Sequence, residues 1–433
     1  MPGAPSTIRV AIIGGGLDGA IVLRGLLRYP HITVDIYESR PSFRDEGPGL
    51  ALARNTQAVL HAIDPALDQS LERVGAVLSY SETRIATGPH SGRIIEINGL
   101  EEQDRRTVGR QAFLTELLTG VPPHMMHVNV RITSITELPG GGGTLLSFAD
   151  GSQKEYDVVI GADGVHGIMR QAVFGNNESL VKPESTGFWG LPITVPLETA
   201  QQAMGTEYLD PARPCQMNWI GSRSIMQHNL INHGSEVQIV IYGKGRDEGK
   251  EENQSGWAKL FTPEEFRAMF ASNRMPVCQG MVGLIESLYT VQVAGICQLQ
   301  HRSAPTYVTK SACLIGDTAH SMLPFQDANV TIVIEEALIL STLLGRLTSK
   351  AAIPAALKAF DQVCRPRAEQ AVRSSFEAGY LMTGQVPGVG LDATLLQQAL
   401  HHKWDFLLDF DIEAHRVAAI GIMDQVLGAN GWH

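Results

Sequence analysis

The sequence predicts a mixed α/β fold, and three observations support this. Residues 8–13 form an apolar, β-branched run, followed by glycines, by apolar residues at helical spacing over 21–27 and by a second strand pattern at 33–37. That order of strand, turn, helix and strand is typical of a buried parallel sheet. From 185 to 299, short alternating runs indicate an antiparallel sheet instead. The last stretch, 391–427, is predicted to be helical.

Further elements follow from local patterns. Short apolar runs at 157–160 and 312–315 predict two more strands. Residues 328–347 predict a long apolar helix, and residues 355–376 predict an amphipathic one. Pro366 lies inside the second of these helices, so we expect a kink there.

The composition excludes several classes of protein. The chain has 433 residues, of which 44% are hydrophobic and 18% charged, so a large core is expected and a mainly disordered chain is excluded. The net charge is -11 and no basic run is present, which argues against nucleic acid as the main partner.

Cysteine usage and the N-terminal sequence predict a cytoplasmic protein. The five cysteines form no CxxC pair or Cys/His cluster, so we expect reduced thiols and no metal site. The apolar run from Val10 is broken at once by Gly14, which is not the pattern of a signal peptide. We also expect no segment long enough to span a bilayer.

A glycine-rich turn follows the first predicted strand. Gly14, Gly16 and Gly19 fit the pattern GxGxxG between a strand and a helix. Gly14 permits the tight turn, Gly16 lets the backbone approach a pyrophosphate, and Gly19 allows close packing of helix on strand. Glu38 ends the next strand at the spacing of a carboxylate that binds a ribose hydroxyl. The pattern predicts a Rossmann-like dinucleotide-binding domain.

Asp18 disturbs this motif. It occupies the first turn of the predicted helix, where a small neutral residue is usual. A carboxylate about 5 Å from a phosphate costs about 3 kcal/mol at an effective dielectric constant near 20. Alternatively, Asp18 points away from the ligand and caps its own helix. The sequence leaves both alternatives open.

Several further motifs occur in an order that resembles one enzyme family. The segments 108–114, 161–166 and 316–320, with the Gly47–Ala51 loop, the glycine turn and Pro324, resemble the FAD-dependent aromatic monooxygenases. The resemblance is to their salicylate-hydroxylase-like branch, which is common in fungal polyketide pathways, and it covers nearly the whole chain.

The resemblance implies a discontinuous FAD-binding domain at 1–184 and 300–380, a substrate domain at 185–299 and a helical C-terminal region at 381–433. It also implies that NAD(P)H is the co-substrate and that a small aromatic or polyketide-type molecule is hydroxylated with O2. Arg170 would follow the DG motif of Asp163, and Trp404 fits the C-terminal half. The implied FAD contacts are Gly14, Gly16, Gly19, Glu38, Arg44, Gly49, Ala51, Arg110, Asp163, Asp317, Pro324 and Val330.

The chain departs from the family after Pro324. Three positions where the family usually has glycines hold Asp327, Asn329 and Thr331, and Gly167 replaces a small hydroxyl residue in the DG motif. Side chains there are expected to take space from the flavin ring, and a β-branched residue cannot easily adopt glycine dihedrals. Either the flavin site has drifted and still works, or these residues replace the cofactor on a flavin-poor scaffold.

Two residues are candidates for substrate chemistry. His228 falls where the relatives place a tyrosine that touches the substrate, and a histidine could remove a phenolic proton near pH 7. A structural or surface histidine is the alternative. Trp189 falls where the relatives often have an arginine, which favours a neutral aromatic or polyene substrate over a carboxylate.

Two other functions remain open at this point. The scaffold could catalyse a redox-neutral cyclisation or isomerisation of a reactive polyketide. It could also be a binding protein or a silent paralogue. The oligomeric state cannot be derived from the sequence.

Overall fold

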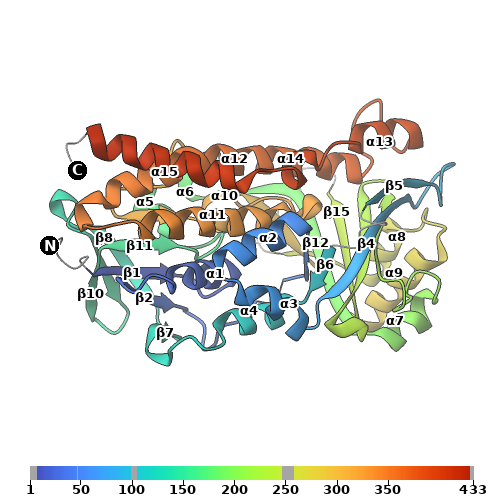
Figure 1. Cartoon of the computed structure of the whole chain (residues 1–433). Coiled ribbons are helices and arrows are strands. Elements are labelled where there is room, and N and C mark those ends of the chain that lie inside the picture. The colour runs from blue at the N-terminus through green and yellow to red at the C-terminus, as the bar shows by residue number, and fades with distance from the viewer. Residues whose placement is uncertain (1–6, 46, 99–104, 246–257, 430–433) are drawn as a thin grey trace.

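The computed structural model describes residues 7–45, 47–98, 105–245 and 258–429. It confirms a mixed α/β fold, with a parallel sheet at one end and a large, mostly antiparallel sheet at the other (Figure 1). The first and last described residues both lie at the end with the parallel sheet.

The parallel sheet has the strand order β18-β11-β1-β2-β7. Every pair along this path is parallel, for example Ile8 with Ile32 and Val10 with Val158. The central strands are mostly buried, because one face packs against the long helices and the other packs against residues of the small antiparallel sheet at 132–156. Their bounds are β1 Ile8–Ile13, β2 Ile32–Tyr37, β7 Met126–His127, β11 Val158–Gly161 and β18 Ala312–Leu314.

Long helices form layers over this sheet (Figure 1). α11 packs against both α1 and α12, and α15 lies on α12 at the outer surface. Shorter helices follow the strands. The bounds are α1 Leu17–Leu26, α2 Arg54–Ile63, α3 Ala66–Arg73, α4 Arg110–Leu118, α5 Met169–Phe174, α6 Glu178–Val181, α10 Gly316–His320, α11 Ala328–Gly345, α12 Ile353–Met382, α13 Ala393–Leu400, α14 Asp405–Leu408 and α15 Ile412–Ala429.

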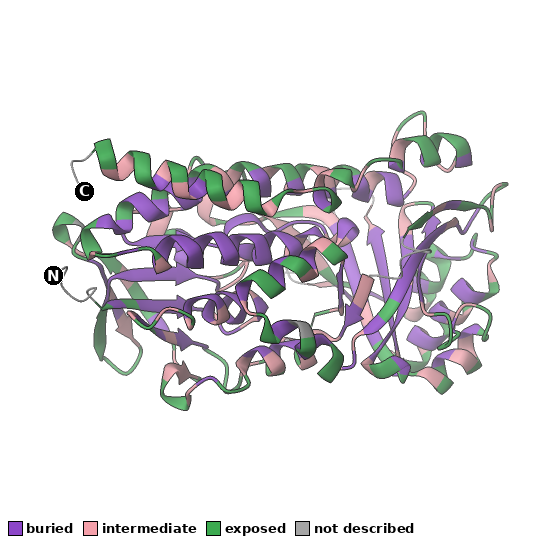
Figure 2. Ribbon diagram, in the orientation of Figure 1, coloured by how far each residue is buried: buried purple, intermediate pink, exposed green. Residues whose placement is uncertain are grey.

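The α11 helix requires a correction to the expectation that no segment could span a bilayer. Residues Ala328–Gly345 are long and apolar enough to do so by length and composition alone. However, 83% of that window is buried inside the protein, and Figure 2 shows the helix as part of the core. This burial is what the core helix of a globular domain requires.

The large sheet has the strand order β16-β17-β12-β15-β14-β13-β4-β6-β3, with β5 paired to β4. It extends beyond the predicted range of 185–299, because β4 pairs in parallel with β13 and brings β3, β5 and β6 into the sheet with it. The bounds are β3 Leu50–Leu52, β4 Val77–Ile85, β5 Ile94–Asn98, β6 Arg105–Val108, β12 Glu184–Pro196, β13 Cys215–Gly221, β14 Ser224–Ile231, β15 Glu236–Lys244, β16 Ala258–Phe261 and β17 Val293–Gln300.

The two faces of this sheet pack against different partners. On the outer face, Trp219, Met226 and Ile239 form a core with the helices α7 (Leu197–Met204), α8 (Pro263–Met269) and α9 (Pro276–Leu288). On the inner face, Ile225 and Tyr242 pack with residues of α12 and α13. Successive side chains along a strand point to opposite faces of the sheet. Neighbouring residues of one strand therefore pack into different cores.

A small antiparallel sheet completes the fold. Its strands are β8 Ile132–Glu137, β9 Thr144–Phe148 and β10 Gln153–Tyr156.

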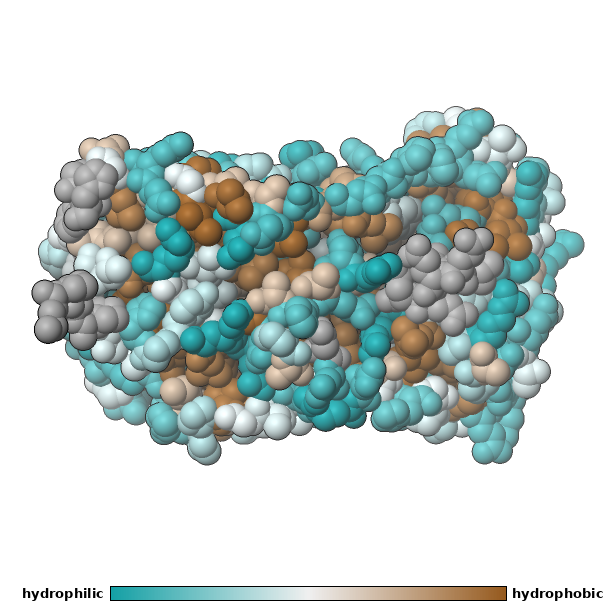
Figure 3. All heavy atoms as spheres, viewed as in Figure 1, coloured by the Kyte–Doolittle hydropathy of each residue, from teal (hydrophilic) through white to brown (hydrophobic). Residues whose placement is uncertain are grey.

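The α12 helix runs without interruption through Pro366, and it is longer than the predicted 355–376. Hydrophobic and hydrophilic residues are interspersed on the face in Figure 3. The division into four sequence segments stays a prediction.

Candidate functional site

The main cavity lies where the parallel strands end. Its volume is about 560 Å³, and it is bounded by the turn after β1, the end of β2, the loop after β11 and the start of α10. The carboxyl ends of parallel strands are the usual ligand position in such sheets. Among the predicted site residues, the lining includes Gly14, Gly16, Glu38, Arg110, Asp163 and Asp317.

The glycine turn has the geometry that close backbone approach requires. Gly14 has a φ of 113°, and a Cβ there would lie 2.0 Å from the carbonyl oxygen of Ala162. A Cβ at Gly19 would lie 2.1 Å from the carbonyl oxygen of Gly14, so glycine is needed for helix α1 to pack on the turn. Gly16 precedes α1, and a Cβ there would meet only Asp45, at 3.9 Å. The start of α1 is therefore open toward the cavity, as anion binding requires.

Glu38 is buried at the end of β2 and is already hydrogen-bonded. Its Oε2 accepts from the N–H of Gly15 at 3.0 Å, and its Oε1 accepts from the N–H of Arg40 at 2.8 Å. These bonds fix the carboxylate at the rim of the glycine turn. A carboxylate held there can also accept the hydroxyls of a ribose.

The loop after β11 explains the unusual Gly167. Asp163 accepts the N–H of Met169 at 3.0 Å and the hydroxyl of Thr318 at 3.2 Å. A Cβ at Gly167 would lie 2.0 Å from the Asp163 carboxyl carbon. Burial raises the pKa of Asp163 to about 6, although these hydrogen bonds oppose the shift. Gly167 thus makes room for a carboxylate that ties this loop to α10.

Arg170, which follows this motif, has a structural position. It is buried, and its guanidinium donates to the carbonyls of Thr318 and Ala319 at 3.0 and 2.9 Å. It therefore holds the loop that carries Asp317 and does not line the described cavity.

Asp18 does not cap its own helix, which removes one of the two alternatives. Helix α1 has no side-chain cap, and Asp18 Oδ2 accepts the N–H of Asp317 at 3.2 Å. A Cβ at Gly316, whose φ is 54°, would lie 2.0 Å from the same oxygen. Asp18 therefore bridges the two turns that meet at the cavity.

Asp317 is held from a second side. Its Oδ1 accepts from the Asn329 side-chain amide at 2.8 Å. Burial raises its pKa, while the positive charge of Arg110 acts in the opposite direction. For Asp18, burial and then repulsion from Asp317 raise the pKa to about 7. Two buried carboxyl groups close to each other cannot both ionise cheaply.

Arg110 begins α4 and faces the same cavity, but its charge is paired. Its Nε donates to Asp45 Oδ1 at 2.6 Å and its Nη2 donates to Asp45 Oδ2 at 3.1 Å. A bidentate pair of this kind is well suited to partial burial. The Asp45 partner was not anticipated from the sequence, because the loop that carries it has no regular pattern.

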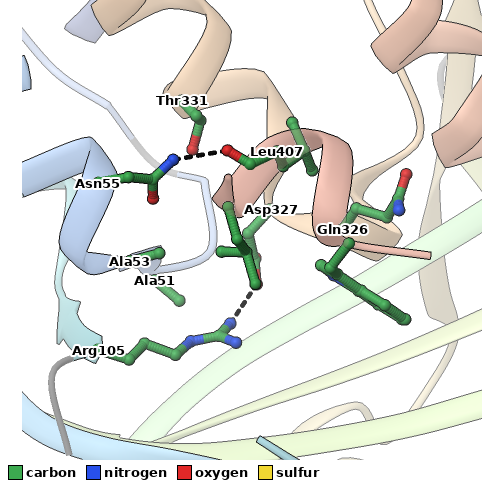
Figure 4. A pocket seen from close by; sticks show the side chains of 10 residues that line it. Ala51, Ala53, Asn55, Arg105, Gln326, Asp327, Thr331 and Leu407 are labelled. Atoms are coloured by element: carbon green, nitrogen blue, oxygen red, sulfur yellow. Dashed lines mark hydrogen bonds and ion pairs between the residues drawn. The ribbon is translucent and has the colours of Figure 1, made fainter. Parts of the chain in front are cut away.

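A second cavity of about 40 Å³ lies at the start of α11 (Figure 4). Asp327 precedes the helix in the left-handed region, with a φ of 52°, and its carboxylate contacts Arg105. Arg105 also donates to Gln216 Oε1 at 2.9 Å. Asp327 thus adopts a backbone conformation that glycine favours, which costs about 1 kcal/mol or more of conformational free energy.

The other two substituted positions are not strained. Asn329 and Thr331 lie inside α11 with helical dihedrals, so the expected conflict between Thr331 and glycine dihedrals is wrong. The Thr331 hydroxyl hydrogen-bonds that of Thr56 at 3.0 Å. Only Asp327 of the three retains a conformation that glycine would favour.

The remaining predicted contacts are more scattered. Ala51 lines the small cavity, whereas the Val330 side chain is buried in the core between α11 and the parallel sheet. Gly49 approaches the Val108 carbonyl, where a Cβ would lie 2.9 Å away. Pro324 starts a short 3-10 helix before α11, and Arg44 is exposed on the loop after β2.

The structure places His228 on the wrong face for substrate chemistry. It follows Met226 by two residues on β14, so its ring points into the outer core, where Trp219 Nε1 donates to it at 3.3 Å. It is fully buried, and burial lowers its pKa to about 3. Trp189 is also in the outer core, against Phe261. Both residues were candidates for substrate contact, with a structural histidine as the alternative for His228. Their positions in the outer core match the structural alternative.

The inner face of the same sheet carries polar residues that the sequence reasoning missed. Asn218 pairs with Gln227, and Asn229 pairs with Gln238, across β13, β14 and β15. Because side chains alternate along a strand, Gln227 and Asn229 lie on the opposite face of β14 from His228. The sequence alone would have indicated this polar face only if the orientation of β14 had been known. Buried amides in neighbouring strands are unusual in an apolar core.

Together these features define an α/β protein with a cavity of about 560 Å³ at the end of its parallel sheet and a second, mostly antiparallel sheet. The chain is 30% identical over 431 residues to 6-methylsalicylate 1-monooxygenase atA of Aspergillus terreus, covering 97% of this chain and 93% of that protein. It is 27% identical over 430 residues to salicylate hydroxylase of Pseudomonas putida, covering 94% and 93%. A solved salicylate hydroxylase substrate complex superposes with a TM-score of 0.80 at 25% identity, covering 96% and 98%.

No family model matches the sequence. The similarity to the curated relatives extends along the whole chain. The protein belongs to the salicylate-hydroxylase-like FAD-dependent monooxygenases, a family of oxidoreductases whose cofactor is FAD. The predicted family and fold are confirmed.

Proposed function

We propose that this protein is an FAD-dependent monooxygenase that hydroxylates a neutral phenolic or polyketide-type metabolite with NAD(P)H and O2. The observation that carries the proposal is the 560 Å³ cavity that gathers the glycine turn, Glu38, Arg110 and Asp317 from four separate segments. Convergence of these groups in one cavity is expected for a dinucleotide site.

The residues of the 560 Å³ cavity fit one part of FAD, whereas the start of α11 departs from what the family has at the other part. The open start of α1 and the carboxylates of Glu38 and Asp317 fit the adenosine, pyrophosphate and ribityl parts. At the start of α11, Asp327 brings a carboxylate where the family has glycine. The bound cofactor would supply electron transfer from NAD(P)H to oxygen. The protein's part is to hold the substrate and exclude water.

The polar face of the substrate sheet supports a neutral, oxygen-rich substrate. Asn229 is 4% exposed, and its amide nitrogen is buried without a partner among the described residues. Such a donor needs an acceptor, which a ketone or phenol oxygen can supply. Arg105, beside Gln216 on this face, is already paired with Asp327, so its charge is balanced.

This charge balance argues against a carboxylate substrate. In the relatives named above, salicylate-type substrates carry a carboxylate. An arginine whose charge is already paired with an aspartate binds such an anion less tightly than an unpaired arginine does. Amide groups recognise neutral carbonyls and hydroxyls equally well at all ordinary pH values.

A redox-neutral cyclase or isomerase on the same scaffold is the second candidate. The Arg105–Asp327 pair favours it, because the pair stands at the helix start where the family has glycines. In that function, a carboxylate would take a proton from one substrate atom and return it to another, without net oxidation. We also propose a cytoplasmic location, which suits the five free cysteines.

A visible absorption spectrum of the purified protein, with and without added FAD, separates the two candidates. The monooxygenase requires flavin absorption that stays with the protein through gel filtration, and NAD(P)H oxidation that depends on substrate. A colourless protein that converts its substrate without NAD(P)H or FAD would support the cyclase and contradict the monooxygenase.

A further inference from the structure

A carboxyl group lines the cavity beside the helix start from which a Rossmann-like turn usually binds phosphate. Asp18 is in the first turn of α1, it lines the 560 Å³ cavity, and its Oδ2 accepts the N–H of Asp317. This hydrogen bond occupies the backbone N–H of Asp317, a residue that also lines the cavity. Helix starts attract anions through free N–H groups and the helix dipole, so a carboxylate in that place competes with a phosphate.

The charged groups around Asp18 do not neutralise it. Asp317 contacts it directly, and Asp45 adds a further negative charge from the loop before β3. Arg110 of α4 is the neighbouring cation and acts to lower the pKa of Asp18, but its Nε and Nη2 already donate to Asp45. His320 of α10 is fully buried, and its ring is hydrogen-bonded to Glu336 of α11 at 2.8 Å. Glu336 also accepts the N–H of Gly316 at 3.1 Å.

The Asp18 carboxyl is well placed to exist in two protonation states. Burial and the nearby Asp317 raise its pKa to about 7. When ionised, it repels a pyrophosphate at the glycine turn. When protonated, it is neutral, and its O–H can donate to a phosphate oxygen. The geometry thus gives the turn one state that accepts an anion and one that rejects it.

We infer that protonation of Asp18 controls dinucleotide binding, so that FAD binds together with one proton and Asp18 determines the affinity of this chain for its cofactor. This inference rests on the proposed function, because it requires that the cavity takes FAD. It concerns a residue at which the chain departs from its family. It extends to ADP, whose diphosphate ends in a phosphate that itself titrates at about pH 6, so the effect of Asp18 on ADP is the difference between the wild type and Asp18→Asn at each pH.

The expected size of the effect follows from Coulomb's law and proton linkage. Repulsion across about 5 Å weakens binding about a hundredfold at an effective dielectric constant near 20. With a pKa of about 7 in the free protein, the dissociation constant should rise about tenfold between pH 6 and pH 8. At pH 8, binding should take up nearly one proton.

The test is a calorimetric titration of the full-length protein with FAD, and separately with ADP, at pH 6, 7 and 8. Measurements at pH 8 in two buffers of different ionisation enthalpy give the number of protons taken up. Asp18→Asn keeps the shape and the acceptor but carries no charge, so its affinity at pH 8 should be at least tenfold tighter than that of the wild type and independent of pH. The affinity of Asp18→Ala for FAD at pH 8 should also be higher than that of the wild type.

Asp150→Asn is the matched control. Asp150 is exposed in a turn between β9 and β10, where it accepts from Ser152, and asparagine suits the same turn. Its affinity and pH dependence should equal those of the wild type. Thermal unfolding of each variant shows whether it is folded.

Two results would contradict the account, and they differ. If the wild type binds FAD equally well at pH 6 and 8 and Asp18→Asn changes nothing, the inference is wrong while the proposed function stands. If neither the wild type nor folded Asp18→Asn binds FAD or ADP at any pH, the proposed function fails, and the inference falls with it.

Discussion

Arg105 on β6 and Asp327 at the start of α11 form an ion pair across a cavity of about 40 Å³ (Figure 4). The two residues are 222 positions apart in the sequence. The pair joins the large sheet to the helix whose start carries glycines in the family. The pair lies at the start of α11, so it bears on cofactor binding and substrate choice in the proposed function.

The first prediction concerns this pair. Asp327→Gly should tighten FAD binding about tenfold, because a carboxylate is removed and a glycine takes over a φ of 52° that suits it. The measurement is quenching of FAD fluorescence on titration. Asn329 and Thr331 are left unchanged, since both lie within the helix. An affinity equal to that of the wild type would show that this helix start does not limit FAD binding.

The second prediction concerns Gly167. Gly167→Ala should lower the unfolding temperature markedly, because the new Cβ would lie 2.0 Å from the Asp163 carboxyl carbon and force that side chain off its partners. A loss of about 2 kcal/mol is expected for a broken buried hydrogen bond and a displaced loop. Differential scanning calorimetry measures this loss.

Gly283→Ala is the control for that substitution. Gly283 is in helix α9, and a Cβ there would meet nothing within 4 Å. Alanine in an open helical position should be neutral or stabilise by up to about 1 kcal/mol. Equal destabilisation of both variants would show that the Asp163 contact is not the cause.

The third prediction concerns His228. Its pKa is lowered to about 3 by burial, so the folded protein holds it neutral while the unfolded chain binds a proton below about pH 6.5. Its contribution to stability is therefore present above that pH and is lost as the pH falls toward 3. His228→Leu should lose less unfolding free energy than the wild type between pH 7 and 4. Urea unfolding at both pH values measures this.

The same variant separates a structural from a catalytic role. Once a substrate is known, the pH profile of turnover should be unchanged in His228→Leu, since the ring faces the outer core. A shifted profile in a stable variant would return His228 to the mechanism.

The fourth prediction concerns the polar face of the substrate sheet. Asn229→Leu should weaken the binding of a neutral phenolic ketone, for which 2,4-dihydroxyacetophenone is a practical probe, by about tenfold, the worth of one buried hydrogen bond. Calorimetric titration measures this. Salicylate should bind the wild type less tightly than the ketone. Preference for salicylate would contradict the neutral-substrate proposal.

Local sequence patterns predicted much of the fold. The first strand occupies residues 8–13 as expected, and the glycine turn is built as its spacing requires. These features depend on residues that are close in sequence. By contrast, β4 joins the large sheet through parallel pairing of Tyr80 with Cys215, a contact between distant segments that no local pattern indicates.

The site was predicted in part for the same reason. Motifs identified the groups around the main cavity, because each motif is a short segment with its own turn geometry. The sequence could not choose between a catalytic and a structural role for His228, since the face on which a strand residue lies is set by the elements that pack against the strand. The pairing of Arg110 with Asp45 depends on a loop whose course the sequence does not reveal.

The most direct test of the central claim is a titration of the wild-type protein with FAD at pH 6, followed by visible absorption after removal of free flavin. The account predicts about one FAD retained per chain, with a shifted flavin spectrum, and a marked loss of bound FAD when the sample is brought to pH 8. A protein that remains colourless at pH 6 with excess FAD would contradict it.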